Sequence, residues 1–473
     1  MVSLRTLVGD DADVLADRNF QLLLLASISS PLGASVVSPI LTELTGPFGV
    51  SATRAGLLMS AFTAPAIVFI PLVGVLSDRY GRKPVLTAGL ALFGAAGLAV
   101  PAAAAVPPGV PLLTEFRAAL GLRLLQGVGY TGIAPVLITA TGDIFDGDAE
   151  ATAQGLRFTT VGISLTVFPL VSGLLVAVAW SFPFLLYAVA LPSAVAVWLV
   201  FTEPTGDSSD ESTADPASDS GDDSAADSTS DTEGGRDASP DGGTESKTER
   251  GDVRALLRRV REPAVAATLL GRAVPGFVWF AFLTYNSVIV VGTLGGSPGE
   301  AGALVAVASV ASAATTTQLG RVTSRFGARF PALAGLVTTC LGLALVALAP
   351  AVPVGFAVGP LALTPGVPAA LFGGTLVGGG FSVTLTLYRT AITGLGGETL
   401  RGGLVSLGES VGRVGSTSSP ILTAAAVAAL RPGGTAVGGA VRSVLLVTAV
   451  GSVAVGAVLL AVGEMETSDT GDR

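Results

Sequence analysis

Long apolar stretches recur along the chain and are separated by short polar or Pro/Gly-containing breaks. A helix needs roughly 20 apolar residues to cross a bilayer. With that length, the pattern predicts twelve membrane-spanning helices in two sets of six. We place them at residues 20–42, 54–77, 85–105, 112–140, 154–177 and 181–201, and then at 265–292, 300–321, 330–350, 367–390, 402–430 and 437–462. The predicted fold class is therefore that of an all-α integral membrane protein.

A strongly polar segment separates the two sets of spans. Residues 203–252 contain few apolar side chains and hold 16 of the 35 acidic residues. Such a segment buries too little surface to offset the entropy of ordering, so we expect a disordered linker. The chain then divides into an N-terminal bundle (1–202), this linker, and a C-terminal bundle (253–473). The second bundle starts with an amphipathic segment, 253–262, which fits either a helix on the membrane surface or a solvated extension of span 7.

Arginine and lysine are distributed unevenly between the predicted loops. If both termini are cytoplasmic, the loops on that side hold most of the cations, and the opposite loops hold little more than Arg54, Arg431 and Arg442. Loops rich in Lys and Arg stay on the cytoplasmic side. The N-terminus shows no cleavable basic-then-apolar pattern. We therefore expect a multi-pass protein of the cell membrane, with both termini and the linker in the cytoplasm.

Composition narrows the chemistry that the chain can perform. Of its 473 residues half are apolar and 13% are charged, with a mean hydropathy of +0.69. Histidine is absent and Cys340 is the single cysteine, which excludes imidazole bases, Cys/His zinc sites and an internal disulfide. We expect no metal, no cofactor, no nucleic-acid partner and no enzymatic activity. The acidic balance with only two lysines favours a halophilic source, a hypothesis that a salt titration of stability would contradict by showing no preference for high salt.

The loop after the second span carries an ordered motif, Gly74-Val-Leu-Ser-Asp78-Arg79-Tyr-Gly81-Arg82-Lys83. Here Gly74 allows two helices to approach closely and Gly81 allows a tight turn. The pattern recurs at the matching place in the second half, as Gly320-Arg-Val-Thr-Ser324-Arg325-Phe-Gly327-Ala-Arg329, with serine in place of the aspartate. Recurrence at this position indicates an internal repeat.

This motif resembles the loop motif between spans 2 and 3 of the major facilitator superfamily. The resemblance implies the MFS fold, with two pseudo-symmetric six-helix bundles that expose a small-molecule substrate alternately to the two sides of the membrane. It also implies a gating latch, in which Asp78 faces the start of span 11 and Arg82 pairs with Asp143 at the end of span 4. The latch would stabilise the outward-facing state. Among subgroups, the chain looks most like twelve-span drug:proton antiporters and sugar-efflux permeases.

Charged residues in two of the predicted spans are candidates for a function inside the membrane. Arg123 lies near the middle of span 4, where a charge is costly unless it faces protein or water. The resemblance links it to proton coupling or anionic groups; alternatively, it braces span 1 through backbone carbonyls. In span 11, Glu409 and Arg413 have the i,i+4 spacing that lets them pair. Since no histidine exists, Glu409 is the candidate proton-carrying group, unless the pair is a structural ion pair.

Span 5 resembles, imperfectly, a glycine and proline motif of family antiporters. Gly155, Pro169 and Gly173 match this motif, but Phe168 stands where a glycine is expected. The resemblance implies close packing of span 5 on span 8. Family substrate sites lie between the two bundles, and aromatic residues at span ends also serve as interface anchors. With that alternative open, the candidate substrate-lining residues are Gln126, Tyr130, Trp279, Tyr285 and Asn286.

The sequence thus predicts a secondary active transporter, monomeric in the bilayer. Its expected activity is proton-coupled export, by antiport, of drug-like or sugar-like solutes. Two alternatives stay open: a symporter or uniporter that imports a metabolite, and a membrane sensor that kept the fold and lost transport.

Overall fold

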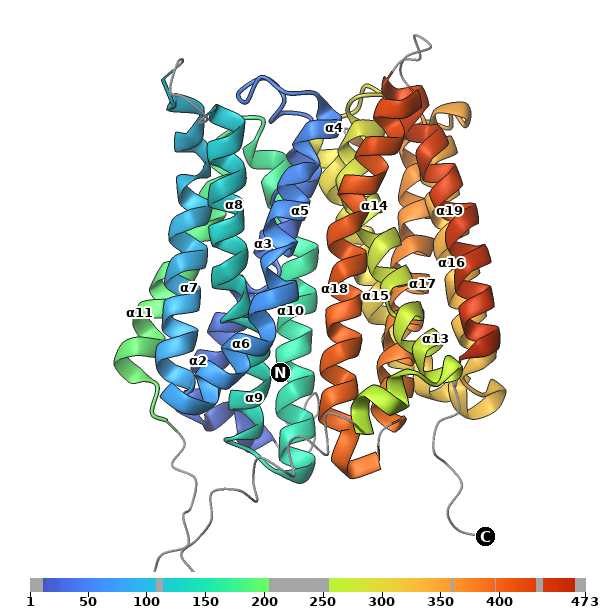
Figure 1. Cartoon of the computed structure of the whole chain (residues 1–473). Coiled ribbons are helices and arrows are strands. Elements are labelled where there is room, and N and C mark those ends of the chain that lie inside the picture. The colour runs from blue at the N-terminus through green and yellow to red at the C-terminus, as the bar shows by residue number, and fades with distance from the viewer. Residues whose placement is uncertain are drawn as a thin grey trace, which may run out of the picture.

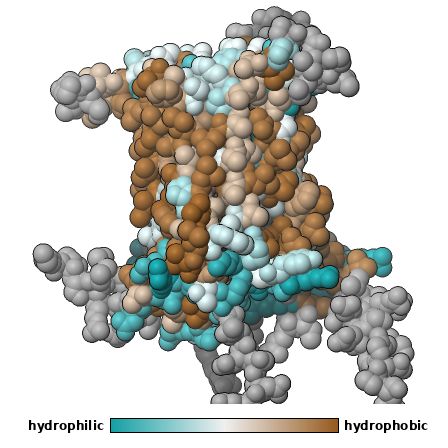
Figure 2. Space-filling model, turned by 90° about the vertical axis from the view of Figure 1, so that its left-hand side faces the viewer, coloured by the Kyte–Doolittle hydropathy of each residue, from teal (hydrophilic) through white to brown (hydrophobic). Residues whose placement is uncertain are grey.

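The computed structural model describes residues 12–107, 114–203, 255–358, 361–395, 397–430 and 437–463. Except for Glu203, the predicted linker lies outside the described residues. The described chain forms two groups of long helices that stand side by side (Figure 1). On the face shown in Figure 2, an apolar band lies between two more polar ends, as a bilayer-embedded protein requires.

The N-terminal group begins with the short helix η1 (Ala12–Ala16), and its six spans are interrupted at glycines, prolines and short 3-10 turns. The six spans consist of α2 (Arg18–Ser29), α3 (Leu32–Ser35) and η2 (Ser38–Ile40); α4 (Ala52–Ala55), α5 (Leu57–Thr63) and α6 (Pro65–Tyr80); α7 (Arg82–Ala99) and η3 (Val100–Ala105); α8 (Glu115–Thr131) and α9 (Ala134–Gly142); α10 (Gly147–Leu175); and η4 (Phe182–Val189) and α11 (Ala190–Val200).

The C-terminal group follows the same order, with a small hairpin added between its third and fourth spans. Its elements are α13 (Pro263–Gly271) and α14 (Ala273–Val290); α15 (Pro298–Phe326); α16 (Arg329–Leu348) with η5 (Ala349–Ala351); the strands β1 (Phe356–Val358) and β2 (Leu361–Leu363); α17 (Val367–Gly394); α18 (Gly397–Leu430); and α19 (Val437–Val462). The two strands are antiparallel, with Phe356 opposite Leu363. The sequence analysis did not predict this hairpin.

Within the described residues, eleven helical segments are long and apolar enough to cross a membrane. The predicted span at 402–430, the eleventh along the chain, corresponds to α18, a helix of 34 residues that packs against α14 and α17. It runs the length of the C-terminal group in Figure 1, although Glu409, Arg413 and a run of serines and threonines make it less apolar than the others. The arrangement is therefore two groups of six.

One end of the molecule, which we call the basic end, carries the turns at Gly81 and Gly327. Both glycines have a positive φ, +92° and +70°, so the repeated motif forms the same kind of turn in both halves. The ends of α11 and α19 also reach this end. Glu203 lies beside the turn at Gly81, and Arg329 donates a hydrogen bond to the carbonyl of Gly463. In Figure 1 the basic end points downward.

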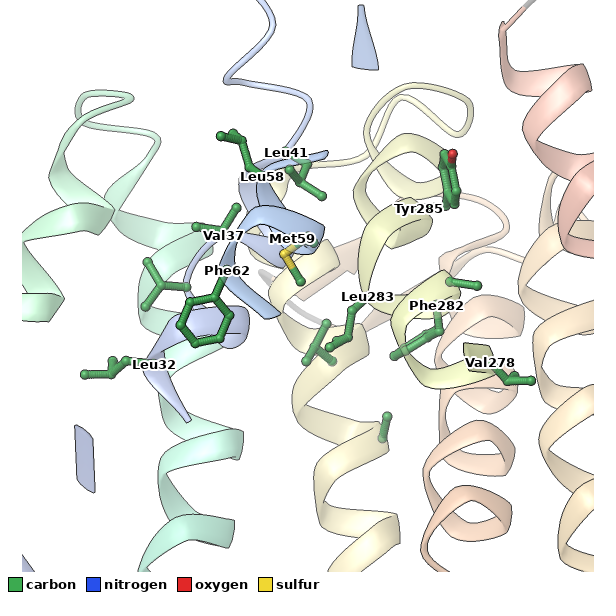
Figure 3. Close-up of a cluster of buried hydrophobic side chains, with 14 of the residues drawn as sticks. Leu32, Val37, Leu41, Leu58, Met59, Phe62, Val278, Phe282, Leu283 and Tyr285 are labelled. Carbon is green, nitrogen blue, oxygen red and sulfur yellow. The ribbon is translucent and has the colours of Figure 1, made fainter. Parts of the chain in front are cut away.

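The two groups meet near the opposite end and separate toward the basic end. All of α5 except Leu57 is buried, whereas residues 71–80 of the following α6 are mostly exposed. In α15, residues 301–309 are mostly buried, whereas almost all residues from 313 to 327 are exposed. The closed part contains an apolar cluster in which Met59 of α5 lies toward Leu283 of α14, while Leu58 and Phe62 lie among side chains of the N-terminal bundle (Figure 3). This exposure pattern is that of a carrier open at its basic end.

The amphipathic segment before α13 packs on protein. Residues 255–260 are helical, and Leu256 and Val260 contact a small apolar cluster formed by α13, α17 and α18. The Arg259 Nε donates to the carbonyl of Leu395 at 3.3 Å. The segment is thus docked against the ends of α17 and α18, so neither placement expected from the sequence describes it fully.

Candidate functional site

The turn between α6 and α7 holds the predicted gating motif. Arg82 Nε donates to Asp143 Oδ2 at 2.8 Å, and Arg82 Nη1 donates to Ser77 at 2.9 Å and to Asp78. The contact shown for Asp78 is therefore within its own bundle, and its side chain is 68% exposed. Since the basic end is open, the expected contact of Asp78 with the start of α18 stays a prediction for the opposite state.

Glu203 is a residue of this site that the sequence analysis missed. Its carboxylate accepts hydrogen bonds from the backbone N–H groups of Arg82, at 3.1 Å, and Lys83, at 2.7 Å. These N–H groups begin α7 and have no partner within the helix, so an anion there is stabilising. In the sequence, Glu203 reads as the first acid of the linker, and nothing local pairs it with a turn more than a hundred residues away. The end of the N-terminal bundle thereby anchors the gating turn.

Replacing Gly81 by alanine is expected to destabilise the protein more than replacing Gly327. Both backbones lie in a region nearly restricted to glycine, which costs roughly 1–3 kcal/mol for other residues. A Cβ on Gly81 would also lie 2.5 Å from the Glu203 carboxylate, whereas one on Gly327 meets nothing within 4 Å. Thermal unfolding of Gly81→Ala and Gly327→Ala in the same detergent measures the difference. Equal losses of stability in the two variants would show that the contact with Glu203 does not add to the stability of the Gly81 turn.

Arg123 lies fully buried in α8 and is surrounded by acceptors. Its Nη2 donates to the Gly33 carbonyl at 2.6 Å and its Nε to the Leu58 carbonyl at 3.2 Å. Its Nη1 donates to Gln126 Oε1 at 2.5 Å and to the Tyr187 hydroxyl at 3.2 Å. The guanidinium group thus ties α8 to spans 1, 2 and 6, and Gln126 serves this network. This geometry favours the bracing role over a role in coupling.

The predicted pairing of Glu409 with Arg413 is wrong. Glu409 accepts hydrogen bonds from Arg389 Nε at 2.7 Å and from Arg272 Nη2 at 3.2 Å. Arg413 turns toward the N-terminal bundle instead, where its Nη2 lies 3.4 Å from the Tyr130 hydroxyl. The i,i+4 spacing permits a pair on one helix, but α13 and α17 bring two other arginines to the carboxylate. A signal for one of them was present, because Arg272 is a cation within the predicted seventh span.

The remaining candidate lining residues fall into two places. Asn286 Nδ2 donates to Ser38 Oγ at 2.6 Å, across the contact between the bundles, and the neighbouring Tyr285 is buried near the same apolar cluster (Figure 3). Trp279 stacks on Phe381, with ring centroids 4.6 Å apart. Of the five candidates, Tyr130 lies beside Arg413, near the arginines that bind Glu409. Asn286 lies in the closed contact between the two bundles.

The closed part of the seam depends on small residues of α10 and α15. A Cβ on Gly173 would collide with the Pro298 carbonyl, and one on Gly302 would collide with the Pro169 carbonyl. Spans 5 and 8 therefore approach to backbone contact at Pro169 and Gly173, as the antiporter resemblance implies. Gly155 lies farther along α10 with open space around its Cα, so it takes no part in this contact.

Hydroxyl groups join the bundles on the same side of the molecule. Ser38 Oγ donates to the Leu283 carbonyl at 2.6 Å, and Ser60 Oγ donates to the Thr417 carbonyl at 2.8 Å. Thr417 Oγ1 in turn donates to Thr63 Oγ1 at 2.9 Å. These few polar contacts and the apolar cluster are what must break if this end is to open.

Solved structures with this fold are transporters. Residues of this chain superpose on a nucleoside transporter, NupG, with a TM-score of 0.67 at 12% identity, covering 95% of this chain and 100% of that one. They superpose on a D-xylose-proton symporter with a TM-score of 0.65 at 14% identity, covering 92% and 96%. A bacterial homologue of the lysosomal transporter Spinster, in an inward-facing conformation, gives 0.64 at 16% identity, covering 94% and 95%. At these identities the likeness concerns the fold alone.

Sequence comparison gives the family. The Bacillibactin exporter of Bacillus subtilis is 33% identical over 155 residues, which is 32% of this chain and 37% of the relative. The class H tetracycline resistance protein of Pasteurella multocida is 26% identical over 197 residues, covering 40% and 45%. The chain spans less than half the length of these relatives. The Major Facilitator Superfamily profile, however, matches residues 23–352. With most of its length matched by this profile, the chain belongs to the Major Facilitator Superfamily of membrane transporters.

Proposed function

We propose that the chain is an exporter, which takes up a small molecule from the cytoplasm and releases it on the other side by alternating access. The observation that carries this proposal is the asymmetry between a sealed opposite end and a separated basic end. We assign the basic end to the cytoplasm, because loops rich in Lys and Arg stay there. Export is supported by relatives that are named as an exporter and as resistance proteins.

The cycle requires a second state, in which the contact between the bundles is closed at the basic end and open at the opposite end. In that state the hydroxyl and apolar contacts between α5, α14 and α18 break, and the basic end closes. Asp78 then reaches the first turn of α18, whose N-terminal dipole favours an anion. The second half has Ser324 and Ala328 where the first half has Asp78 and Arg82. We therefore propose that one latch sets the balance between the two states.

Glu409 is the group that we propose to couple movement to protons. It lies in α18, the helix that contacts α5 at the closed end, and its side chain is 29% exposed. Ionised, it is held between Arg272 and Arg389, with Arg413 one turn away on the same helix. Protonated, it would release both arginines. The charge on Glu409 can therefore change the contacts of α14, α17 and α18 together.

Replacing Glu409 by glutamine is expected to remove the dependence of transport on a pH gradient while leaving exchange across the membrane. The neutral side chain keeps the shape of the protonated acid but cannot ionise. Transport of the dyes fluorescein and rhodamine 6G into proteoliposomes, with and without an imposed pH gradient, measures the effect. Glu43→Gln, in the turn after η2, is the matched control. A gradient response equal to that of the unmodified protein would rule out Glu409 as the proton carrier.

A further inference from the structure

The charged cluster between the bundles carries more positive than negative charge. Arg272, Arg389 and Arg413 come from three spans of the C-terminal bundle, and Glu409 is the acid that the described structure shows among them. Three guanidinium groups against one carboxylate leave two positive charges in a partly water-excluded space. Such an excess is electrostatically costly unless an anion enters.

These arginines leave the backbone at different distances from the helix ends at the basic end, and their long side chains bring Arg272 and Arg389 to the same Glu409 carboxylate. Arg389 is five residues from the end of α17, Arg272 nine residues from the start of α13, and Arg413 sixteen residues from the start of α18. At about 1.5 Å per residue these distances are about 8, 14 and 24 Å along the helices. The Arg389 side chain is 48% exposed, whereas that of Arg272 is 7% exposed. The cations form a path from the open end toward the middle of the molecule.

The N-terminal bundle adds a fourth cation on the facing side. Arg157 of α10 is 3% exposed, its Nε donates to Gln154 at 3.1 Å, and it lies within electrostatic reach of Tyr130. The Arg413 guanidinium lies 5.4 Å from the Tyr130 ring centroid. Tyr130 is thus within reach of one arginine from each bundle.

Two of these buried guanidinium groups retain donors without a partner. Arg157 Nη2 and Arg272 Nε are buried donors that have no acceptor among the described residues. A buried donor left without a partner costs about 1–3 kcal/mol, and most such donors in proteins are paired. An acceptor that enters from the open end would accept hydrogen bonds from both guanidinium groups. Oxyanions match the guanidinium geometry best.

We propose that the solute is a small organic anion, whose carboxylate, phosphate or sulfonate group binds between Arg413, Arg389 and the Tyr130 hydroxyl, with Arg157 facing it from the other bundle. This inference rests on the proposed function and names the substrate class. The same surplus of positive charge repels organic cations, so the site discriminates by charge. In the empty carrier, Glu409 serves as the internal counter-ion for two of the arginines.

Whether the proton and the solute move in the same or in opposite directions follows from a competition for the arginines. A bound anion and the ionised Glu409 compete for the same guanidinium groups, so a proton on Glu409 favours anion binding. For an anionic substrate the proton and the solute therefore bind together. Antiport, which the sequence led us to expect, requires that the proton and the solute exclude each other from the site. This site does not favour antiport. A monovalent anion that leaves together with the proton moves no net charge, so the inside-negative membrane potential, about 2.3 kcal/mol per charge and 100 mV, drives export only when the anion leaves without that proton.

The test compares two dyes that share a xanthene ring system and differ in charge, fluorescein and rhodamine 6G. Binding to the purified protein in detergent is measured by fluorescence anisotropy, and transport is measured separately in proteoliposomes. We expect fluorescein to bind and rhodamine 6G not to bind. Arg413→Gln should weaken fluorescein binding at least tenfold, in line with loss of one charge-assisted hydrogen bond, and Arg413→Lys should recover part of it. Arg325→Gln, an exposed arginine of α15 outside the cluster, is the matched control and should bind as the unmodified protein does.

Each outcome separates the anion site from transport. Fluorescein binding that Arg413→Gln abolishes, without passage of either dye, keeps the anion site and rejects the exporter. Passage of rhodamine 6G without binding of fluorescein keeps the carrier and rejects the anion site, as does fluorescein binding that Arg413→Gln leaves unchanged. No binding of fluorescein at all also rejects it. Displacement of fluorescein by added phosphatidylglycerol would assign the cluster to a lipid headgroup and overturn the soluble-anion proposal.

Discussion

A disulfide between cysteines introduced at Thr63 and Thr417 is expected to abolish transport, and a reducing agent is expected to restore it. The two side-chain oxygens lie 2.9 Å apart across the seam between the bundles, which is within reach of the 2.05 Å sulfur–sulfur bond after small adjustments. The cross-link would hold the opposite end closed. If the carrier works by alternating access, it can then take up solute from the basic end but cannot release it.

The chain suits this experiment because its single cysteine, Cys340, is buried in α16 and need not be removed. Dye transport in proteoliposomes is compared for Thr63→Cys, Thr417→Cys and the double variant, each under oxidising and reducing conditions. The single variants should transport equally under both conditions. Undiminished transport by the fully cross-linked protein would mean that this seam does not open in the cycle, and the assigned conformational change would have to be abandoned.

Replacing Arg123 by leucine is expected to prevent accumulation of folded protein. The substitution removes the buried donor that the Gly33 and Leu58 carbonyls, Gln126 Oε1 and the Tyr187 hydroxyl share. Each unsatisfied buried group costs about 1–3 kcal/mol, and the total is comparable to the whole stability of many proteins. Detergent-solubilised yield and thermal unfolding measure the loss.

Arg123→Lys separates bracing from proton coupling. Lysine keeps the charge, but its single ammonium group cannot satisfy acceptors in spans 1, 2 and 6 at once. We expect a lowered unfolding temperature with the pH-gradient response of dye transport preserved. The opposite result, normal stability with a lost gradient response, would make Arg123 a coupling residue and contradict the role that its hydrogen bonds favour.

The local pattern was sufficient to predict most of the architecture. Recurring apolar stretches of bilayer length predict the spans, and the transition at Glu203 marks the end of the first bundle. The repeat of the Gly81 motif at Gly327 predicts matching turns in both halves, and both glycines do have positive φ. The structural partners of Arg82 and the close packing at Gly173 followed from the family resemblance, which carries tertiary information that periodicity lacks.

Contacts between helices were decided by the tertiary structure alone. The spacing of Glu409 and Arg413 on one helix suggested a pair, yet Glu409 is bound by Arg272 and Arg389 from other spans. The anchoring of the gating turn by Glu203 joins residues about 120 positions apart. Which end of the molecule is closed, and hence that Asn286 lies in a seam, also appears only in three dimensions.

By itself the sequence determined what each segment is: a membrane span, a polar linker, a glycine turn, a charge that must find a partner. Only the tertiary structure decided which partner each charge finds. The physical reason is that burial and helix formation depend on residues close in the chain, whereas a guanidinium or carboxylate group pairs with whatever the rotation and approach of neighbouring helices bring within 3 to 4 Å of it. For this protein, that second step turns scattered arginines into one facing cluster.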